Sequence, residues 1–162
     1  MPVQKEKDQR PNILYSCYSR TSRDGEHFVP EHIFGYTLAG SSETYLDGNT
    51  YVFKEGDFRF FRRNQLAKYA KYPPANGGEY RSISVAIDQE TLRSISEEYN
   101  LHMTMPYTGR NVLHLQPNVL FTNFINSLEP YLHSTGQLGE ALVKLKVKEI
   151  VMILLQTNPE LK

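Results

Sequence analysis

The sequence of 162 residues predicts an α+β fold, in which an antiparallel β-barrel or jelly roll is followed by C-terminal helices. Most of the 11 Tyr and 8 Phe lie between residues 15 and 80, where Gly residues recur between short apolar segments. Aromatic segments separated by glycine turns are typical of antiparallel strands. After residue 87 the apolar residues recur with a helical period instead. The length is that of one domain.

Short strands separated by turn signals are expected in the first part of the chain. Asp47-Gly48 followed by Asn49 favours a two-residue type I′ hairpin turn, because both central residues of that turn need a positive φ. Residues 1–12 are polar and have no apolar period, so we expect a flexible N-terminal arm there. The β-barrel is assigned to residues 13–88, with strands at 13–18, 32–39, 43–46, 50–54, 57–61, 66–72 and 79–87.

The second part of the chain has the signals of helix starts and ends. Asp88 is a suitable N-cap for the first helix, and Asn100 suits its end. Pro117 suits the first turn of the second helix. The expected helices span residues 89–99, 118–129 and 137–157, and residues 89–162 form a helical segment packed on the barrel.

The last expected helix has more apolar surface than contact with one barrel face requires, since such a helix needs only one apolar stripe about 100° wide. A second face carries Leu142, Leu145 and Ile153. Either the helix at 118–129 covers the surplus, or the last helix packs on its copy in a second subunit as a symmetric homodimer. The candidate dimer-interface residues form one stripe, Val143, Val147, Ile150, Val151 and Leu154.

Composition excludes several classes of protein. The 18 Lys and Arg balance 18 Asp and Glu, so the chain lacks the basic character of an autonomous nucleic-acid-binding protein. No apolar run approaches the ~20 residues of a membrane span, and the first residues lack a signal-peptide core, so we expect a cytoplasmic protein with no membrane partner. A single cysteine, Cys17, excludes a disulfide framework. Lys144, Lys146 and Lys148 of the last helix are expected to be solvated.

Residues suited to catalysis or metal binding are sparse. A metal-dependent β-barrel enzyme needs two His two residues apart, a carboxylate and a further His on neighbouring strands, so that the ligands converge on one ion. Here Phe34 stands two residues after His32, and residues 62–69 contain no His. Nucleophile motifs and phosphate-binding glycine loops are also missing from the sequence. We therefore expect no enzyme, with no catalytic residue, metal or cofactor.

A ligand pocket is the remaining candidate site. One face of the expected strand at 32–39 would line the barrel interior. Its side chains are mostly aromatic and two of them end in polar groups, a composition typical of small-molecule pockets. The same side chains could instead simply fill the core. Lys68 and Arg81 would select an anionic ligand if they pointed inward, although outward solvated positions are their default. The candidate ligand residues are His32, Phe34, Tyr36, Leu38, Lys68 and Arg81.

Four segments resemble the N-terminal cupin-type domain of AraC-family transcriptional regulators. They are HIFGYTLAG (32–40), KEGD (54–57), RRNQLAKYAK (62–71) and GGEYRSIS (77–84). The third segment is similar to the branch that includes activators of type III secretion genes. Residues 144–162 also resemble the interdomain helix of the family, and the likeness extends over residues 13–162.

The resemblance implies an effector-sensing and dimerisation domain. In such regulators this domain binds a small effector inside the barrel, or a regulatory protein, and it dimerises through helices. A C-terminal domain with two helix-turn-helix units binds DNA, and no such units follow residue 157. We expect that DNA-binding domain to lie outside this chain, which is either a piece ending at a linker or a stand-alone module. Two alternatives stay open: a small stand-alone cupin enzyme (isomerase or oxygenase), and a protein-binding regulatory module with a filled barrel.

Overall fold

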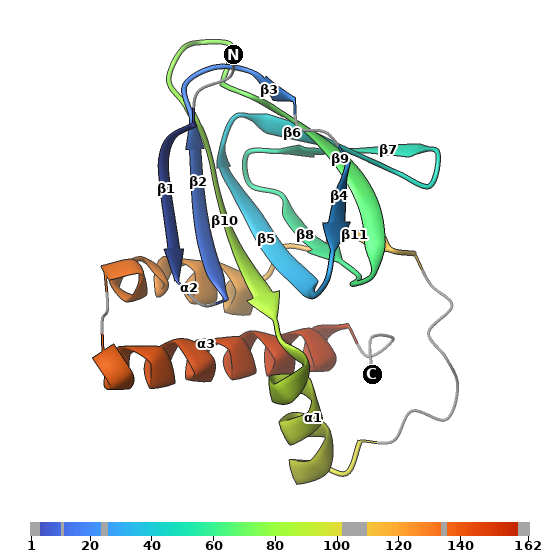
Figure 1. The fold of residues 1–162 in the computed structure, drawn as a ribbon, viewed down its shortest axis with the longest axis vertical. Helices are drawn as coiled ribbons and strands as arrows, with labels where there is room; N and C mark the ends of the chain where they lie inside the picture. Colours follow the sequence, from blue (N-terminus) through green and yellow to red (C-terminus); the bar gives the residue numbers. More distant parts are fainter. Residues whose placement is uncertain (1–3, 11, 24–25, 102–109, 134–135, 159–162) are drawn as a thin grey trace.

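The computed structural model describes residues 4–10, 12–23, 26–101, 110–133 and 136–158, and it consists of two antiparallel sheets and C-terminal helices (Figure 1). One sheet, called the first sheet here, has the strand order β1-β2-β10-β5-β8-β11. The second sheet has the order β3-β9-β6-β7, with β4 also paired to β9. The predicted α+β class is confirmed. The predicted β-barrel or jelly roll takes the form of two antiparallel sheets that do not close into a barrel.

The element bounds of the described residues are as follows. The strands are β1 (Gln4–Arg10), β2 (Ile13–Tyr18), β3 (Ser22–Arg23), β4 (His27–Val29), β5 (His32–Ala39), β6 (Ser41–Leu46), β7 (Asn49–Lys54), β8 (Phe58–Phe61), β9 (Gln65–Tyr72), β10 (Tyr80–Ile87) and β11 (Val112–Leu115). The helices are α1 (Gln89–Glu98), α2 (Val119–Asn126), the 3-10 helix η1 (Glu129–His133) and α3 (Gly136–Thr157). None of these helices is long and apolar enough to cross a membrane.

Local signals in the sequence predicted turns and caps correctly. Asp47 and Gly48, between β6 and β7, have φ values of 53° and 76°, as the type I′ turn requires. The Asp88 side chain accepts a hydrogen bond from the Thr91 N–H at 2.9 Å and caps α1. The second helix begins one residue later than expected from Pro117, because Asn118 is its N-cap.

Three parts of the described fold differ from the sequence prediction. The expected arm contains β1, a polar strand that pairs with the edge of β2; its composition lacks the aromatic and β-branched residues that mark strands. The expected helical segment contains β11, which pairs with β8 and extends the first sheet. The very short strands β3 and β4 pair with β9 and were not predicted, because two or three residues show no period.

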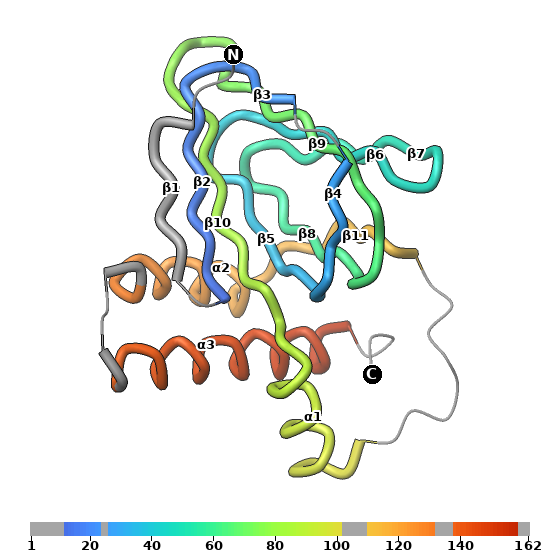
Figure 2. Tube along the Cα trace, viewed as in Figure 1, coloured from blue at the N-terminus to red at the C-terminus, as the bar shows by residue number. Residues whose placement is uncertain are grey.

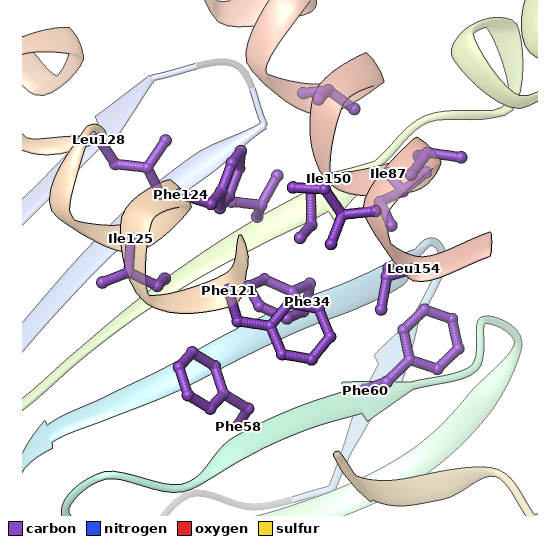
Figure 3. Packing of buried hydrophobic residues seen from close by; sticks show 14 of the residues in the cluster. Phe34, Phe58, Phe60, Ile87, Phe121, Phe124, Ile125, Leu128, Ile150 and Leu154 are labelled. Carbon is purple, nitrogen blue, oxygen red and sulfur yellow. The ribbon is translucent and has the colours of Figure 1, made fainter. Parts of the chain in front are cut away.

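The helices α2 and α3 pack on the outer face of the first sheet and form the larger hydrophobic core (Figure 3). Phe34 of β5 is at the centre of this core, with its ring centroid 5.2 Å from that of Phe121 of α2. Ile150 of α3 is fully buried in the same cluster. A smaller cluster lies between the two sheets and joins Phe53 and Leu46 of the second sheet to Phe61 of the first, with Val29, Ala67 and Val112.

Strand β10 continues almost directly into α1, and Figure 2 shows the trace passing from one to the other. Asp88 alone separates the two elements. Its carboxylate also accepts a hydrogen bond from the Asn12 side chain at 3.0 Å. At the far end of α1, Glu98 forms an ion pair with Lys148 of α3 at 2.9 Å, so α1 is attached to the sheet at one end and to α3 at the other.

Candidate functional site

The strand β5 presents two buried faces, and the predicted ligand residues lie on the face that meets the helices. Phe34, Tyr36 and Leu38 all belong to or pack against the large core with α2 and α3. The centroids of Tyr36 and Phe58 are 4.5 Å apart on this same face. The prediction that these side chains line the barrel interior was therefore wrong, because they pack against the helices. The alternation of side chains along β5 correctly predicted that these residues share one face. It did not predict whether the helices or the second sheet cover that face.

His32 lies at the start of the same face. Its ring stacks on Phe60 at 5.5 Å, and its Nδ1 accepts a hydrogen bond from the Arg63 N–H at 3.1 Å. Burial, followed by the nearby charges of Arg63 and Arg62, lowers the pKa of His32 from 6.5 to about 4. The imidazole is therefore neutral at pH 7, and its hydrogen bond ties the start of β5 to the segment after β8.

The opposite face of the first sheet points toward the second sheet and is polar in its middle. Strand register places Ser16, Ser82 and Thr37 side by side across β2, β10 and β5. The second sheet contributes Ser42 and Thr44 of β6, which lie on the same face of the strand as Leu46 of the inter-sheet cluster. All five side chains are buried. We call these five residues the hydroxyl band.

Arg59 of β8 lies beside the hydroxyl band with 5% of its surface exposed. Its Nη1 donates a hydrogen bond to Thr37 Oγ1 at 2.9 Å. Its Cζ lies 5.8 Å from the centroid of the Phe53 ring, across the space between the sheets. The guanidinium extends over Gly35, where a Cβ would lie 2.9 Å from both Cζ and Nε of Arg59. Glycine at position 35 thus leaves the room that the arginine occupies.

Arg59 was not among the residues that the sequence predicted for the interior. The signal was available, because Arg59 stands between Phe58 and Phe60 and must point to the opposite side of its strand. The two cations that the sequence did single out, Lys68 and Arg81, are exposed on the outside of their sheets. Both side chains therefore point outward, as the sequence led us to expect, and the fold does not bring them together with the other predicted ligand residues.

The predicted dimer stripe of α3 lies in the core of the chain itself. Its five residues, Val143, Val147, Ile150, Val151 and Leu154, are buried against the first sheet, α1 and α2. The stripe therefore offers no free surface to a second subunit, which corrects the assignment made from the sequence. Ile153, from the second apolar face, is buried as well.

A different face of α3 is exposed and apolar. Leu138 and Leu145 are 81% and 60% exposed, and Leu142 and Met152 lie on the same face. A pocket of about 410 Å³ lies beside it, between α1 and α3, lined by Glu90, Thr91, Ser94, Ala141, Lys144, Leu145 and Lys148. Lys146, expected to be solvated, is instead buried between the rings of Phe124 and Tyr131 and donates hydrogen bonds to Ser127 and Glu149.

Within the described ranges no group of three or more His, Cys, Asp or Glu side chains gathers in an arrangement that could hold a metal ion. The chemical character of the region between the sheets comes instead from hydroxyl groups, one guanidinium and aromatic rings.

The model of the ExsA N-terminal regulatory domain family matches residues 32–162. The chain belongs to the ExsA N-terminal regulatory domain family. This confirms the resemblance to AraC-type regulators that the four sequence segments indicated. No curated protein sequence matches the chain.

Solved structures show the same fold in transcriptional regulators. Apo ToxT K231A from Vibrio cholerae superposes with a TM-score of 0.64 at 10% identity, over 92% of this chain and 58% of that one. ToxT bound to (E)-4-(8-methylnaphthalen-1-yl)but-3-enoic acid gives 0.59 at 10% identity, over 91% and 58%. The AraC-like transcriptional activator CuxR gives 0.57 at 15% identity, over 88% and 51%. This ExsA-type domain therefore spans between half and three fifths of those chains.

Proposed function

We propose that this ExsA-type domain senses an effector and dimerises as the regulatory part of an AraC-type transcription factor, with DNA bound by a domain outside this chain. The family match over residues 32–162 carries the proposal. A regulatory domain family also supports a role other than catalysis, against the alternative of a small cupin isomerase or oxygenase.

The sensing role is supported by the polar region between the sheets. Core space between packed sheets is ordinarily filled by apolar side chains. Here the smaller inter-sheet cluster fills one part of that space, while the hydroxyl band and Arg59 occupy another. Small-molecule sites are lined mainly by apolar and aromatic side chains with a few convergent polar groups, and the inter-sheet cluster beside Arg59 and the hydroxyl band has both parts.

The dimerisation role is supported by the exposed face of α3. Leu138, Leu142, Leu145 and Met152 fit the 4-3 spacing of a heptad pattern that suits packing against a second helix, with Glu149 at the position between Leu145 and Met152. The occupant that we propose is α3 of a second copy, because a two-fold pair uses the same patch on both subunits. The open pocket beside Leu145 would accept part of the partner's apolar side chains.

Sedimentation equilibrium at micromolar concentrations tests the dimer. The wild-type chain should be a dimer, and the double variant Leu142→Glu/Leu145→Glu should be a monomer with an unchanged melting temperature, because both leucines are exposed in the single chain. Leu66→Glu, an equally exposed apolar position on the second sheet, serves as the control and should stay dimeric. A wild-type chain that is monomeric at high micromolar concentration contradicts the proposal.

A protein-binding role is the second candidate function, and one observation favours it. Phe28 of β4 and Leu66 of β9 are direct cross-strand partners on the outer face of the second sheet, and each is 57% exposed. Tyr45 and Val52 are exposed on the same sheet. Phe28→Ser/Leu66→Ser should then change promoter activity in the complete regulator without changing its dimerisation. Unchanged activity would remove this candidate.

A further inference from the structure

The starting observation is a buried positive charge with no carboxylate beside it. Arg59 is nearly fully buried, and its contacts among the described residues are the Thr37 hydroxyl, the face of Phe53 and the backbone at Gly35. No ion pair joins Arg59 to any acidic side chain in the part of the chain that the structure describes. Removing a guanidinium from water is costly unless an anion pairs with it.

The surroundings of Arg59 are hydroxyl groups on small side chains. Two packed sheets lie about 10 Å apart, and large side chains normally fill that distance. Next to Arg59, however, the register places Gly35, Ser84 and Leu14 in one row and Thr37, Ser82 and Ser16 in the next. Ser42 and Thr44 approach from the second sheet. Each of these hydroxyls can both donate and accept a hydrogen bond.

Apolar side chains border this polar region on two sides. The Tyr18 and Tyr80 pair, with centroids 6.2 Å apart, forms the row beyond Ser16 and Ser82. On the other side lies the inter-sheet cluster that includes Phe53 and Phe61. Phe53 also stacks on His114 at 4.2 Å, directly across from Arg59. A ligand here would have a cation at one point, hydroxyl groups around it and an aromatic face beside it.

We infer that the region between the sheets binds a small hydroxylated carboxylate, with the carboxylate paired to Arg59 and the ligand hydroxyls bonded to the hydroxyl band. The inference rests on the proposed sensing function and names its ligand class. A guanidinium has a planar set of donors that matches a carboxylate in a bidentate pair. The hydroxyls of Ser16, Ser82, Thr37, Ser42 and Thr44 supply the complementary donors and acceptors.

Acetate is the minimal probe of the carboxylate subsite. Sodium acetate replaces sodium chloride at constant ionic strength, and the melting temperature of the whole 162-residue chain is followed by circular dichroism. The wild-type chain should gain about 2–4 °C at saturating acetate, because a ligand that binds only the folded state stabilises it. Arg59→Met should gain nothing, while Arg81→Met, which removes an exposed arginine of β10, should respond like the wild type.

Thr37→Val keeps the test decisive if Arg59→Met does not fold. This nearly isosteric change removes only the hydroxyl that orients the guanidinium, so it should weaken the acetate effect several-fold. If the wild-type chain responds no more to acetate than to chloride, or if the Arg59 and Arg81 variants respond equally, the carboxylate subsite is wrong.

The proposed role of the hydroxyl band is tested by comparing the binding of D-glucuronate with that of acetate and of neutral D-glucose. Glucuronate should bind at least about tenfold more tightly than acetate, since several neutral hydrogen bonds add to the ion pair. Equal affinity for glucuronate and acetate would reject the role of the hydroxyl band, and only the carboxylate subsite at Arg59 would then be retained. Sedimentation of the same samples reports dimerisation separately, so a failure of the anion site is distinguishable from a failure of the proposed regulatory function.

Discussion

At the scale of single residues, the interior of this domain depends on a glycine and an arginine that occupy the same space. Gly35 has no positive φ, so its conformation does not require glycine; the side chain of Arg59 does. The arginine reaches across β5 and places its charge next to Thr37. Two residues from different strands thus place a charged group beside the hydroxyl band in the interior.

Gly35→Ala should destabilise the fold by about 1–3 kcal/mol, because the new methyl group would lie 2.9 Å from the guanidinium carbon. Urea denaturation followed by circular dichroism measures the change. In an Arg59→Ala background the same substitution should cost much less, since the colliding group is gone. Equal costs in the two backgrounds would show that Arg59 is not the obstacle.

His32 makes the stability of the domain depend on pH. In the unfolded chain His32 has a pKa of 6.5, whereas in the folded chain its pKa is about 4. Between these pH values the unfolded state therefore binds more protons than the folded state. The free energy of unfolding should therefore fall as the pH is lowered from 6.5 to 4, by about 1–2 kcal/mol after allowance for partial exposure. His32→Gln should remove this part of the loss, and exposed His27→Gln should leave it in place. Parallel urea midpoints at pH 7, 6 and 5 for the wild type and His32→Gln would contradict the assignment.

At the scale of elements, α3 has two faces with different tasks. Its buried face joins the sheet, and Val147 and Ile150 on that face are fully buried. The exposed face is the proposed contact with a second copy. The division explains why the sequence showed more apolar surface on this helix than one barrel face can cover.

Val147→Glu/Ile150→Glu should abolish folding, because two unpaired carboxylates would enter an apolar core. The far-UV circular dichroism spectrum should lose its native signal at 25 °C. The exposed pair Leu142→Glu/Leu145→Glu is the matched comparison on the same helix and should keep a native spectrum. A folded monomer from the Val147 and Ile150 variant would return the dimer interface to the buried stripe.

Lys146 connects α3 to α2 and η1 through polar and aromatic contacts. It donates a hydrogen bond to Glu149 at 2.7 Å and another to Ser127, and its ammonium lies 4.9 Å from the Phe124 ring centroid. Lys146→Ala should cost about 1–3 kcal/mol of stability from the lost hydrogen bonds and ring contacts. Lys144→Ala, on the exposed side, should cost less than about 0.5 kcal/mol in the same urea titration.

Local chemistry made turns, caps and most strands predictable from the sequence. The hairpin at Asp47-Gly48 and the cap at Asp88 depend on neighbouring residues only. The facing of β5 was not predictable in this way, because both of its faces are buried, one by helices and one by a sheet. Alternation separates two faces but does not say which of them meets a given layer. Alternation with Phe58 and Phe60 indicated the side of β8 on which Arg59 lies, but the room for its side chain depends on a glycine in another strand.

At the scale of the whole molecule, the absence of net charge has a consequence for association. With 18 basic and 18 acidic side chains there is no overall repulsion between copies. The proposed contact is apolar, so its dissociation constant should change by less than about threefold between 50 and 500 mM NaCl. Analytical ultracentrifugation at the two salt concentrations measures this. A dimer that dissociates in high salt would indicate a charged interface elsewhere.

The single residue between β10 and α1 gives the molecule a stiff internal connection. Ser82 and Ser84 of β10 border the polar region, and the same strand ends at Asp88, the cap of α1. No flexible loop lies between them to absorb a displacement, and α1 holds α3 through Glu98 and Lys148. We therefore expect a shift of β10 along its axis to displace α1 as well, and α3 with it through the Glu98–Lys148 ion pair.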